Sequence, residues 1–239
     1  MNAQELFRAG KLADALKALS AEVRDNPADA RKRTFLFELL CFAGDFERAD
    51  KQLEVLAQAG PSSEIGVLLY RSAVYAERQR QDLFTKGEYP KLTESAAATG
   101  GFFNNKPFSS FSDADPRIGP RLELFAAGTY LLLPFEHVAS IRMEPPKRLR
   151  DLIWIPAAVR AKASFKGAEL GEVLLPALSP LTWQHTDEAV RLGRATVWEQ
   201  RDGFDEEVPF GQKMWMVDNE EVPFLDLRSL SFGSAPAGE

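Results

Sequence analysis

The sequence predicts an α+β protein of two domains, and three observations lead to this prediction. A 34-residue repeat typical of helical hairpins occupies the first part of the chain. Short apolar segments with the alternation of β-strands follow after residue 121. All four tryptophans lie in that second part. We therefore expect an all-α, tetratricopeptide-like domain over residues 1–88, a linker packed on the surface over 89–120, and a mainly antiparallel β domain over 121–239.

The repeat rests on residue pairs 34 positions apart, among them Gly10 and Gly44, Ala15 and Ala49, and Pro27 and Pro61. The glycines suit a tight turn between antiparallel helices, the alanines allow close approach, and the prolines end each copy. The expected helices span residues 3–8, 12–25, 29–43, 46–59 and about 61–84. Arg78 stands where a third turn glycine would fall, so the fifth helix is expected to cap the stack.

The second domain is predicted to hold about seven short strands and one short helix. Hairpins are expected over 122–135, with Ala127–Gly128 near the turn, and over 213–232, with Asp218–Asn219 at the tip. Further strands are expected over 137–144, 151–165, 171–178 and 194–200, and a helix over 185–193. This pattern is typical of an SH3-like barrel or a small antiparallel sheet. Four phenylalanines between residues 102 and 111 are expected to hold the preceding linker in place.

Composition narrows the classes of function. A net charge of −6 argues against general nucleic-acid binding, which needs a basic surface. A single cysteine cannot form an internal disulfide, which favours a reducing compartment. The N-terminus lacks the features of a signal peptide, and no apolar run is long enough to span a membrane. We expect a cytoplasmic protein whose partners are neither nucleic acids nor membranes.

The residues that could carry catalysis lack the spacing that catalysis needs. Cys41 lies in an apolar helical segment, which is typical of a small core residue. His185 is followed by adjacent acids, which lack the ligand spacing of a metal site. Asp113 fits an Asx turn. We expect no catalytic residue, metal or cofactor; the alternative is a metal-dependent hydrolase that uses His185, Asp187 and Asp113 of the C-terminal domain.

A stack of helical hairpins forms a concave groove lined by the first helix of each hairpin. The repeat places nine residues near this groove: Phe7, Arg8, Arg31, Thr34, Glu38, Phe42, Leu68, Ser72 and Tyr75. Their mixture of apolar and charged groups suits an amphipathic helix or an extended peptide. The alternative is that Phe42, Leu68 and Tyr75 pack the core between the helices. A second patch, Lys147, Arg148 and Arg150, is predicted to be either a solvated loop or a surface for an acidic partner.

Five segments carry a family pattern in their order along the chain. They are "RTFLFELLCFAGDFERADKQL", "DADPRIGPRLEL", "YLLLPFEHVASIRMEPPKRLRDLIW", "LLPALSP" and "RLGRATVW". Together they resemble the ImpE family, also called the TagJ or SciE-type family, of type VI secretion accessory proteins. The resemblance covers nearly the whole chain.

The resemblance implies a cytoplasmic adaptor with no catalytic residues. It implies binding to the small sheath subunit of the type VI secretion system through that subunit's N-terminal helix. It also implies a direct or indirect link to the ClpV-type AAA+ ATPase that disassembles the contracted sheath. The predicted groove would then receive the sheath helix. The remaining alternative is a structural scaffold or homo-oligomer with no peptide groove.

Overall fold

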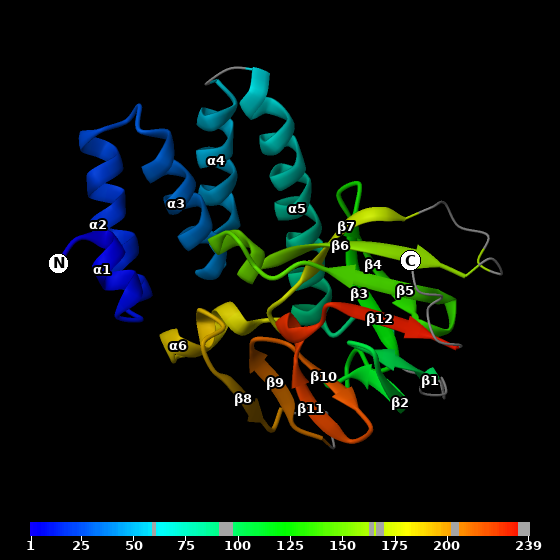
Figure 1. Ribbon diagram of the computed structural model, residues 1–239. Helices are drawn as coiled ribbons and strands as arrows, with labels where there is room; N and C mark the ends of the chain where they lie inside the picture. The colour runs from blue at the N-terminus through cyan, green and yellow to red at the C-terminus, as the bar shows by residue number, and fades with distance from the viewer. Residues whose placement is uncertain (59–60, 91–97, 163–164, 166–169, 202–205, 234–239) are drawn as a thin grey trace.

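Helices occupy most of the first 86 residues and stack as antiparallel hairpins (Figure 1). They are α1 (Ala3–Arg8), α2 (Leu12–Asp25), α3 (Ala30–Phe42), α4 (Phe46–Ala57) and α5 (Pro61–Lys86). These bounds confirm the predicted helices to within two residues, while the tetratricopeptide-like character of the stack stays a prediction. The structure, a computed structural model, describes residues 1–58, 61–90, 98–162, 165, 170–201 and 206–233. Within these ranges no helix is both long and apolar enough to cross a bilayer.

Side chains at the helix starts satisfy the free backbone N–H groups. The Asn2 side chain accepts a hydrogen bond from the N–H of Glu5, and the Glu5 carboxylate accepts one from the N–H of Asn2. The carboxylates of Asp29 and Asp45 cap α3 and α4. The cap of α2 comes from far along the chain. The Glu188 carboxylate accepts a hydrogen bond from the backbone N–H of Ala13, the second residue of α2, at 2.7 Å.

The described part of the C-terminal half forms a ten-stranded antiparallel sheet and a two-stranded ribbon. The sheet order is β11-β10-β2-β1-β12-β5-β6-β7-β3-β4. Its strands are β1 (Ala98–Phe103), β2 (Lys106–Asp113), β3 (Arg121–Ala126), β4 (Thr129–Pro134), β5 (Val138–Met143), β6 (Trp154–Ala161), β7 (Gly171–Pro176), β10 (Met214–Val217), β11 (Glu220–Pro223) and β12 (Ser229–Phe232). The ribbon pairs β8 (Thr196–Glu199) with β9 (Val208–Gly211), and α6 (Glu188–Arg191) precedes it.

Two of these strands lie where the sequence predicted a linker over 89–120. β1 and β2 form a hairpin whose turn residues, Asn104 and Asn105, have positive φ angles of 48° and 65°. Two such residues make the type I′ turn that joins antiparallel strands. Phe111 of β2 is buried in the core of the sheet. The linker prediction is therefore wrong for residues 98–113.

The sheet is also larger than the predicted SH3-like barrel or small sheet. β12, near the end of the chain, pairs with β1 through Leu230 and Phe103 and with β5 through Leu230 and Ile141. These pairings join segments more than eighty residues apart in sequence, and local patterns carry no signal for them. Residues 91–97 of the predicted linker lie outside the described residues.

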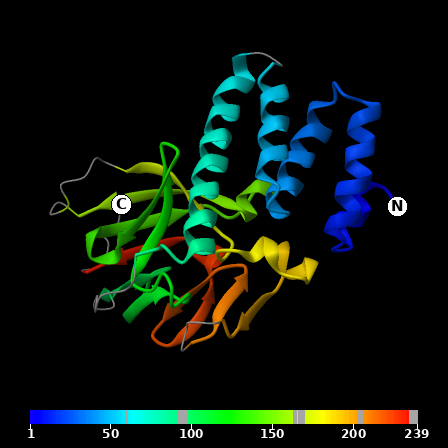
Figure 2. The ribbon, with the colours of Figure 1, turned by 180° about the vertical axis from the view of Figure 1, so that it is seen from behind.

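Helices cover one face of the sheet. One apolar cluster contains the buried side chains of the helices together with Phe125, Tyr130, Trp154 and Leu174 of the sheet. A second cluster, which includes Phe111, lies on the opposite face, because alternate residues of a strand point to opposite sides. α5 packs against β3 and β4, and its upper turns rise beyond the tip of their hairpin (Figure 2). The helical layer and the sheet therefore share a core; a domain boundary at residue 88 stays a prediction.

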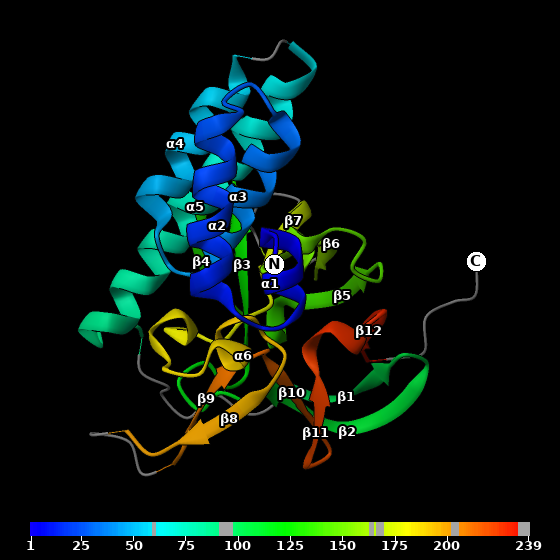
Figure 3. The same cartoon turned by 90° about the vertical axis from the view of Figure 1, so that its left-hand side faces the viewer.

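The segment that carries α6 lies beneath the helical hairpins and binds their turns (Figure 3). Arg194 donates to the carbonyl oxygens of Phe7 and Arg8, at the C-terminal end of α1, at 2.7 and 3.0 Å. A cation at this end also interacts favourably with the helix dipole. The Trp183 ring lies against Gly44, where a Cβ would be 2.4 Å from it. Gly44 has a φ of +73°, so both the turn and this contact require glycine.

A group of buried charged side chains joins α5 to the sheet. Arg80 of α5 donates from Nε to Glu123 of β3 at 2.7 Å and from Nη1 to Glu77 at 3.0 Å. Lys213 also contacts Glu123, and its Nζ lies 2.6 Å from a carboxylate oxygen of Asp113 in β2. All five side chains are buried. These five residues form the buried charged group.

Protonation of Glu123 depends on its two cationic neighbours. Burial raises the pKa of this carboxyl, but the charges of Arg80 and Lys213 outweigh the effect and hold the pKa at about 2. Burial raises the pKa of Asp113 to about 6, against the opposing charge of Lys213. The ordinary pKa of Glu123 is 4.5. The stability contributed by its ionised form is therefore present above that pH and lost as the pH falls toward 2.

Glu123→Gln should lower the free energy of unfolding at pH 7 by about 3–5 kcal/mol, because Arg80 and Lys213 would lose their shared carboxylate in the interior. Urea unfolding followed by circular dichroism measures the change. Glu47→Gln is the control, since it removes an exposed carboxylate paired with Lys51 at 2.8 Å and should leave stability nearly unchanged. Equal effects of the two substitutions would contradict the importance of the buried charged group.

Candidate partner-binding surfaces

The predicted concave groove is closed at its centre. Phe42 is 1% exposed and Glu38 is 8% exposed. The C-terminal half covers this part of α3 with a 3-10 turn, Leu149–Leu152, and with Trp154, whose ring centroid lies 6.4 Å from that of Phe37. The prediction that Phe42 and Glu38 line an open groove is wrong, because α3 uses this face to pack against the rest of the chain. Phe42 is a core residue.

Three other predicted groove residues lie on a different side of α5. Tyr70 is the residue that faces α3, with its ring centroid 6.0 Å from that of Phe37. At about 100° per residue, Ser72 lies about 200° and Tyr75 about 140° around the helix from Tyr70. Leu68 and Tyr75 are 69% and 61% exposed, so they do not pack the core, and their directions around α5 differ from that of Tyr70. α5 runs unbroken from Pro61 to Lys86 through Arg78, where a third turn would fall, so the 34-residue repeat does not continue in α5.

The remaining groove residues lie around α1 and the first turns of α3. Phe7 packs edge-on against a phenylalanine of α3 at 5.6 Å between centroids, and the Arg194 guanidinium covers its ring at 4.9 Å. Arg8 and Arg31 are exposed. The Thr34 hydroxyl donates to a carbonyl of its own helix. Partner binding by this part of the groove stays a prediction.

The predicted basic patch divides into one buried contact and two exposed side chains. Arg150 stacks over the ring of Tyr70 at 4.6 Å and lies 3.8 Å from Glu38. Lys147 and Arg148 are exposed and line a cavity of about 380 Å³ beside Tyr70. Carboxylates line the same cavity, namely Glu144, Asp151 and Glu172. Binding of an acidic partner at this patch therefore has no clear charge advantage and stays a prediction.

Exposed large apolar side chains gather on one side of α5. The α5 outer face consists of Ile65, Leu68, Leu69 and Tyr75, which are 80%, 69%, 48% and 61% exposed. At about 100° per residue these four positions fall within an arc of about 120°. In the described residues, the other exposed large apolar side chains are Met1, Val55 and Leu131. A contiguous apolar face on a projecting helix is typical of a protein-binding surface.

The residues of the alternative hydrolase have other partners. Nε2 of His185 lies 3.0 Å from the carboxylate of Glu199. Asp187 caps α6, and Asp113 belongs to the buried charged group. Burial raises the pKa of the Cys41 thiol well above its usual value. Among the described residues, no three His, Cys, Asp or Glu side chains are grouped so that they could hold a metal ion.

Known proteins match the chain along most of its length. The family model described as "ImpE protein" matches residues 105–231. The type VI secretion system accessory component TagJ of Pseudomonas aeruginosa is 35% identical to this chain, with 97% of this chain and 91% of TagJ covered. The chain belongs to the ImpE family. The resemblance predicted from the five sequence segments is thereby confirmed.

A crystal structure of another protein is similar to the whole fold. This protein, from Vibrio parahaemolyticus, is 25% identical and aligns with a TM-score of 0.83, with 97% of each chain covered. The ImpE family model begins at residue 105, so it does not include α1 to α5. TagJ and the Vibrio structure extend the similarity across the helical layer as well.

Burial of Glu38 under the C-terminal half should make stability depend on pH. Burial raises the pKa of Glu38 from 4.5 to about 7, although the charge of Arg150 opposes the rise. Between these pH values the folded state binds more protons at Glu38 than the unfolded state does. Stability should therefore fall as the pH rises through this range.

Glu38→Gln removes this titration. The free energy of unfolding of the variant, relative to that of the wild-type protein, should therefore rise by about 2–3 kcal/mol from pH 5 to pH 8. Urea unfolding at the two pH values measures the gain. Glu38→Asp keeps a carboxyl group and should keep the pH dependence. A constant difference between wild type and Glu38→Gln at both pH values would contradict the burial of a titrating group at this position.

Proposed function

We propose that this chain is a non-catalytic adaptor of the type VI secretion system. It binds the N-terminal helix of the small sheath subunit and links the contractile sheath to a ClpV-type disassembly ATPase. One observation carries the proposal: a relative 35% identical over 97% of the chain is described as an accessory component of this secretion system. Because the sheath and its ATPase are the partners, the adaptor acts in the cytoplasm.

The distribution of polar groups supports an adaptor over an enzyme. The five ionisable residues of the buried charged group bind one another, and the cavity that Glu77 and Arg80 border holds only about 20 Å³. His185 and Asp187 of the alternative hydrolase serve a side-chain contact and a helix cap. The exposed apolar side chains of the described residues lie mainly on helices. Helices with an exposed apolar face bind other helices by side-chain complementarity.

The purified full-length protein should bind a fluorescent peptide that contains the first residues of the small sheath subunit. About 20 residues suffice, because they form a helix about 30 Å long. Fluorescence anisotropy should show saturable binding. A peptide of the same composition in scrambled order should bind at least about tenfold more weakly, because its apolar residues no longer share one helix face. Absence of binding by the folded protein would overturn the sheath-binding role.

The link to the ATPase needs a separate measurement. The ATPase, the small sheath subunit and this protein are mixed in pairs and all together, and the complexes are separated by size exclusion. The sheath subunit should elute with the ATPase in larger amount when this protein is present. No change in its elution would contradict the linking role and leave sheath binding to be judged by the anisotropy measurement.

A further inference from the structure

We propose that the partner helix docks on the α5 outer face, and not in the concave groove of the helical stack. The inference rests on the proposed adaptor function, because it locates the surface that receives the sheath helix. The α5 outer face (Ile65, Leu68, Leu69 and Tyr75) holds four of the exposed large apolar side chains in the described residues. Its expected occupant is an amphipathic helix with acidic residues along one flank.

The dimensions of the α5 outer face suit one helix. From Ile65 to Tyr75 the face runs for about 15 Å, nearly three helical turns, at 1.5 Å per residue. The spacing of three and four residues that separates Ile65, Leu68 and Leu69 repeats the pattern of a helix-binding face. A partner helix with apolar residues at the same spacing can therefore pack its side chains between them.

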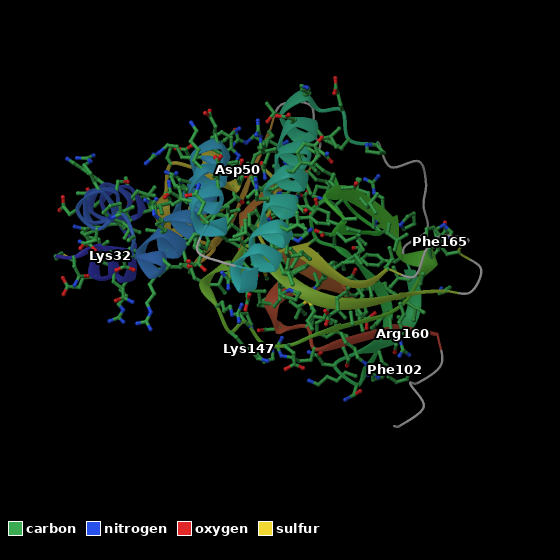
Figure 4. The ribbon with its side chains drawn as sticks, turned by 90° about the horizontal axis from the view of Figure 1, so that it is seen from above. Lys32, Asp50, Phe102, Lys147, Arg160 and Phe165 are labelled. Carbon is green, nitrogen blue, oxygen red and sulfur yellow. The ribbon has the colours of Figure 1, made fainter. Side chains whose placement is uncertain are left out.

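The concave side of the stack is already occupied by the chain itself. Arg150, in the loop that carries the 3-10 turn Leu149–Leu152, covers Tyr70 and lies 3.8 Å from Glu38. Seen from above, Asp50 of α4 and Lys147 of that loop lie on opposite sides of the helical layer (Figure 4). Arg71 of α5 pairs with Asp50 at 2.9 Å. The side of α5 that carries Arg71 therefore faces away from the loop that closes the groove.

The α5 outer face continues a side of the helix that already contacts the β3–β4 hairpin. Ser72 lies on the same side of α5, and its nearest atoms would be 3.6–3.8 Å from a Cβ at Gly128, in the turn between β3 and β4. Farther along the helix, Gln79 accepts a hydrogen bond from the N–H of Tyr130 at 3.4 Å. The hairpin thus covers the later turns of α5, while the earlier turns project beyond it (Figure 2). A docked helix would extend this contact along α5.

Charge selects the occupant of the α5 outer face. Arg78 is exposed and follows Tyr75 around the helix, so it forms a basic flank beside the apolar residues; its neighbour Arg71 already pairs with Asp50. Acidic residues on the partner helix would face Arg78. A second copy of this chain fits less well, because antiparallel two-fold pairing of α5 would place the same basic flank on both sides of the contact. A dimer through this face would also be small, because its four side chains supply roughly half of the ~800 Å² per partner that stable interfaces bury.

The test uses the labelled sheath peptide and full-length variants. Leu68→Glu with Tyr75→Glu should weaken binding at least about tenfold, because two apolar contacts would be replaced by charges of the partner's sign. Arg78→Glu should weaken binding about threefold or more and reduce its dependence on salt. Leu131→Glu is the matched control, since it makes the same change at an exposed leucine of β4. Arg31→Glu tests the concave side. Leu131→Glu and Arg31→Glu should each change binding by less than about twofold.

Each result has a distinct meaning, provided that circular dichroism shows every variant to be folded. If the wild-type protein does not bind the peptide, the proposed function fails. If the wild type binds and the Leu68→Glu, Tyr75→Glu variant binds equally well, the sheath-binding function stands and the docking site on α5 is wrong. Loss of binding in Arg31→Glu alone would assign the peptide to the groove. Light scattering that shows a wild-type dimer and a monomeric Leu68→Glu, Tyr75→Glu variant would make the face a contact between copies, which would also overturn the inference.

Discussion

The guanidinium of Arg80 lies in the interior of the protein, and α5 can pack on the sheet only where carboxylates compensate its charge. An unpaired ion in this position would cost several kcal/mol. Glu123 on β3 and Glu77 one turn earlier on α5 supply the opposing charges, and Lys213 balances Glu123 and Asp113 in turn. A guanidinium donates in fixed directions, so the contact sets both the position of α5 and its rotation about its own axis.

That rotation decides which surfaces of the helical layer face solvent. It directs Tyr70 toward α3 and the loop that carries Arg150, so the concave side of the stack packs against the chain's own C-terminal half. The segment with α6 adds to this by binding the C-terminal end of α1 and the turn at Gly44. The opposite side of α5 is left with four exposed apolar residues. A helical stack without the sheet would present its concave face; this protein presents the outer face of its last helix.

The same contacts account for the chemical character of the molecule. The members of the buried charged group are paired with one another, and Glu38 and Arg150 join α3 to the C-terminal half. These ionisable groups stabilise the fold, and the pKa values of Glu123, Asp113 and Glu38 are shifted by burial and by the neighbouring charges. In the proposed function, the exposed apolar face of α5 recognises another helix. This agrees with membership of the ImpE family and with the accessory role in the description of TagJ.

The sequence by itself determined the helices, the predominance of β-structure after them and the family. Turn glycines at positions 10 and 44, capping residues and apolar spacing act locally, so their pattern can be read without the rest of the chain. The turn at Asn104–Asn105 was an equally local signal for β1 and β2, which the linker prediction overlooked. Only the tertiary structure decided which apolar faces are buried. The spacing along α3 and α5 shows that a face is apolar, but whether it meets the sheet or solvent depends on Glu123 and Lys213, which lie far along the chain from Arg80 and reach it only in the folded protein.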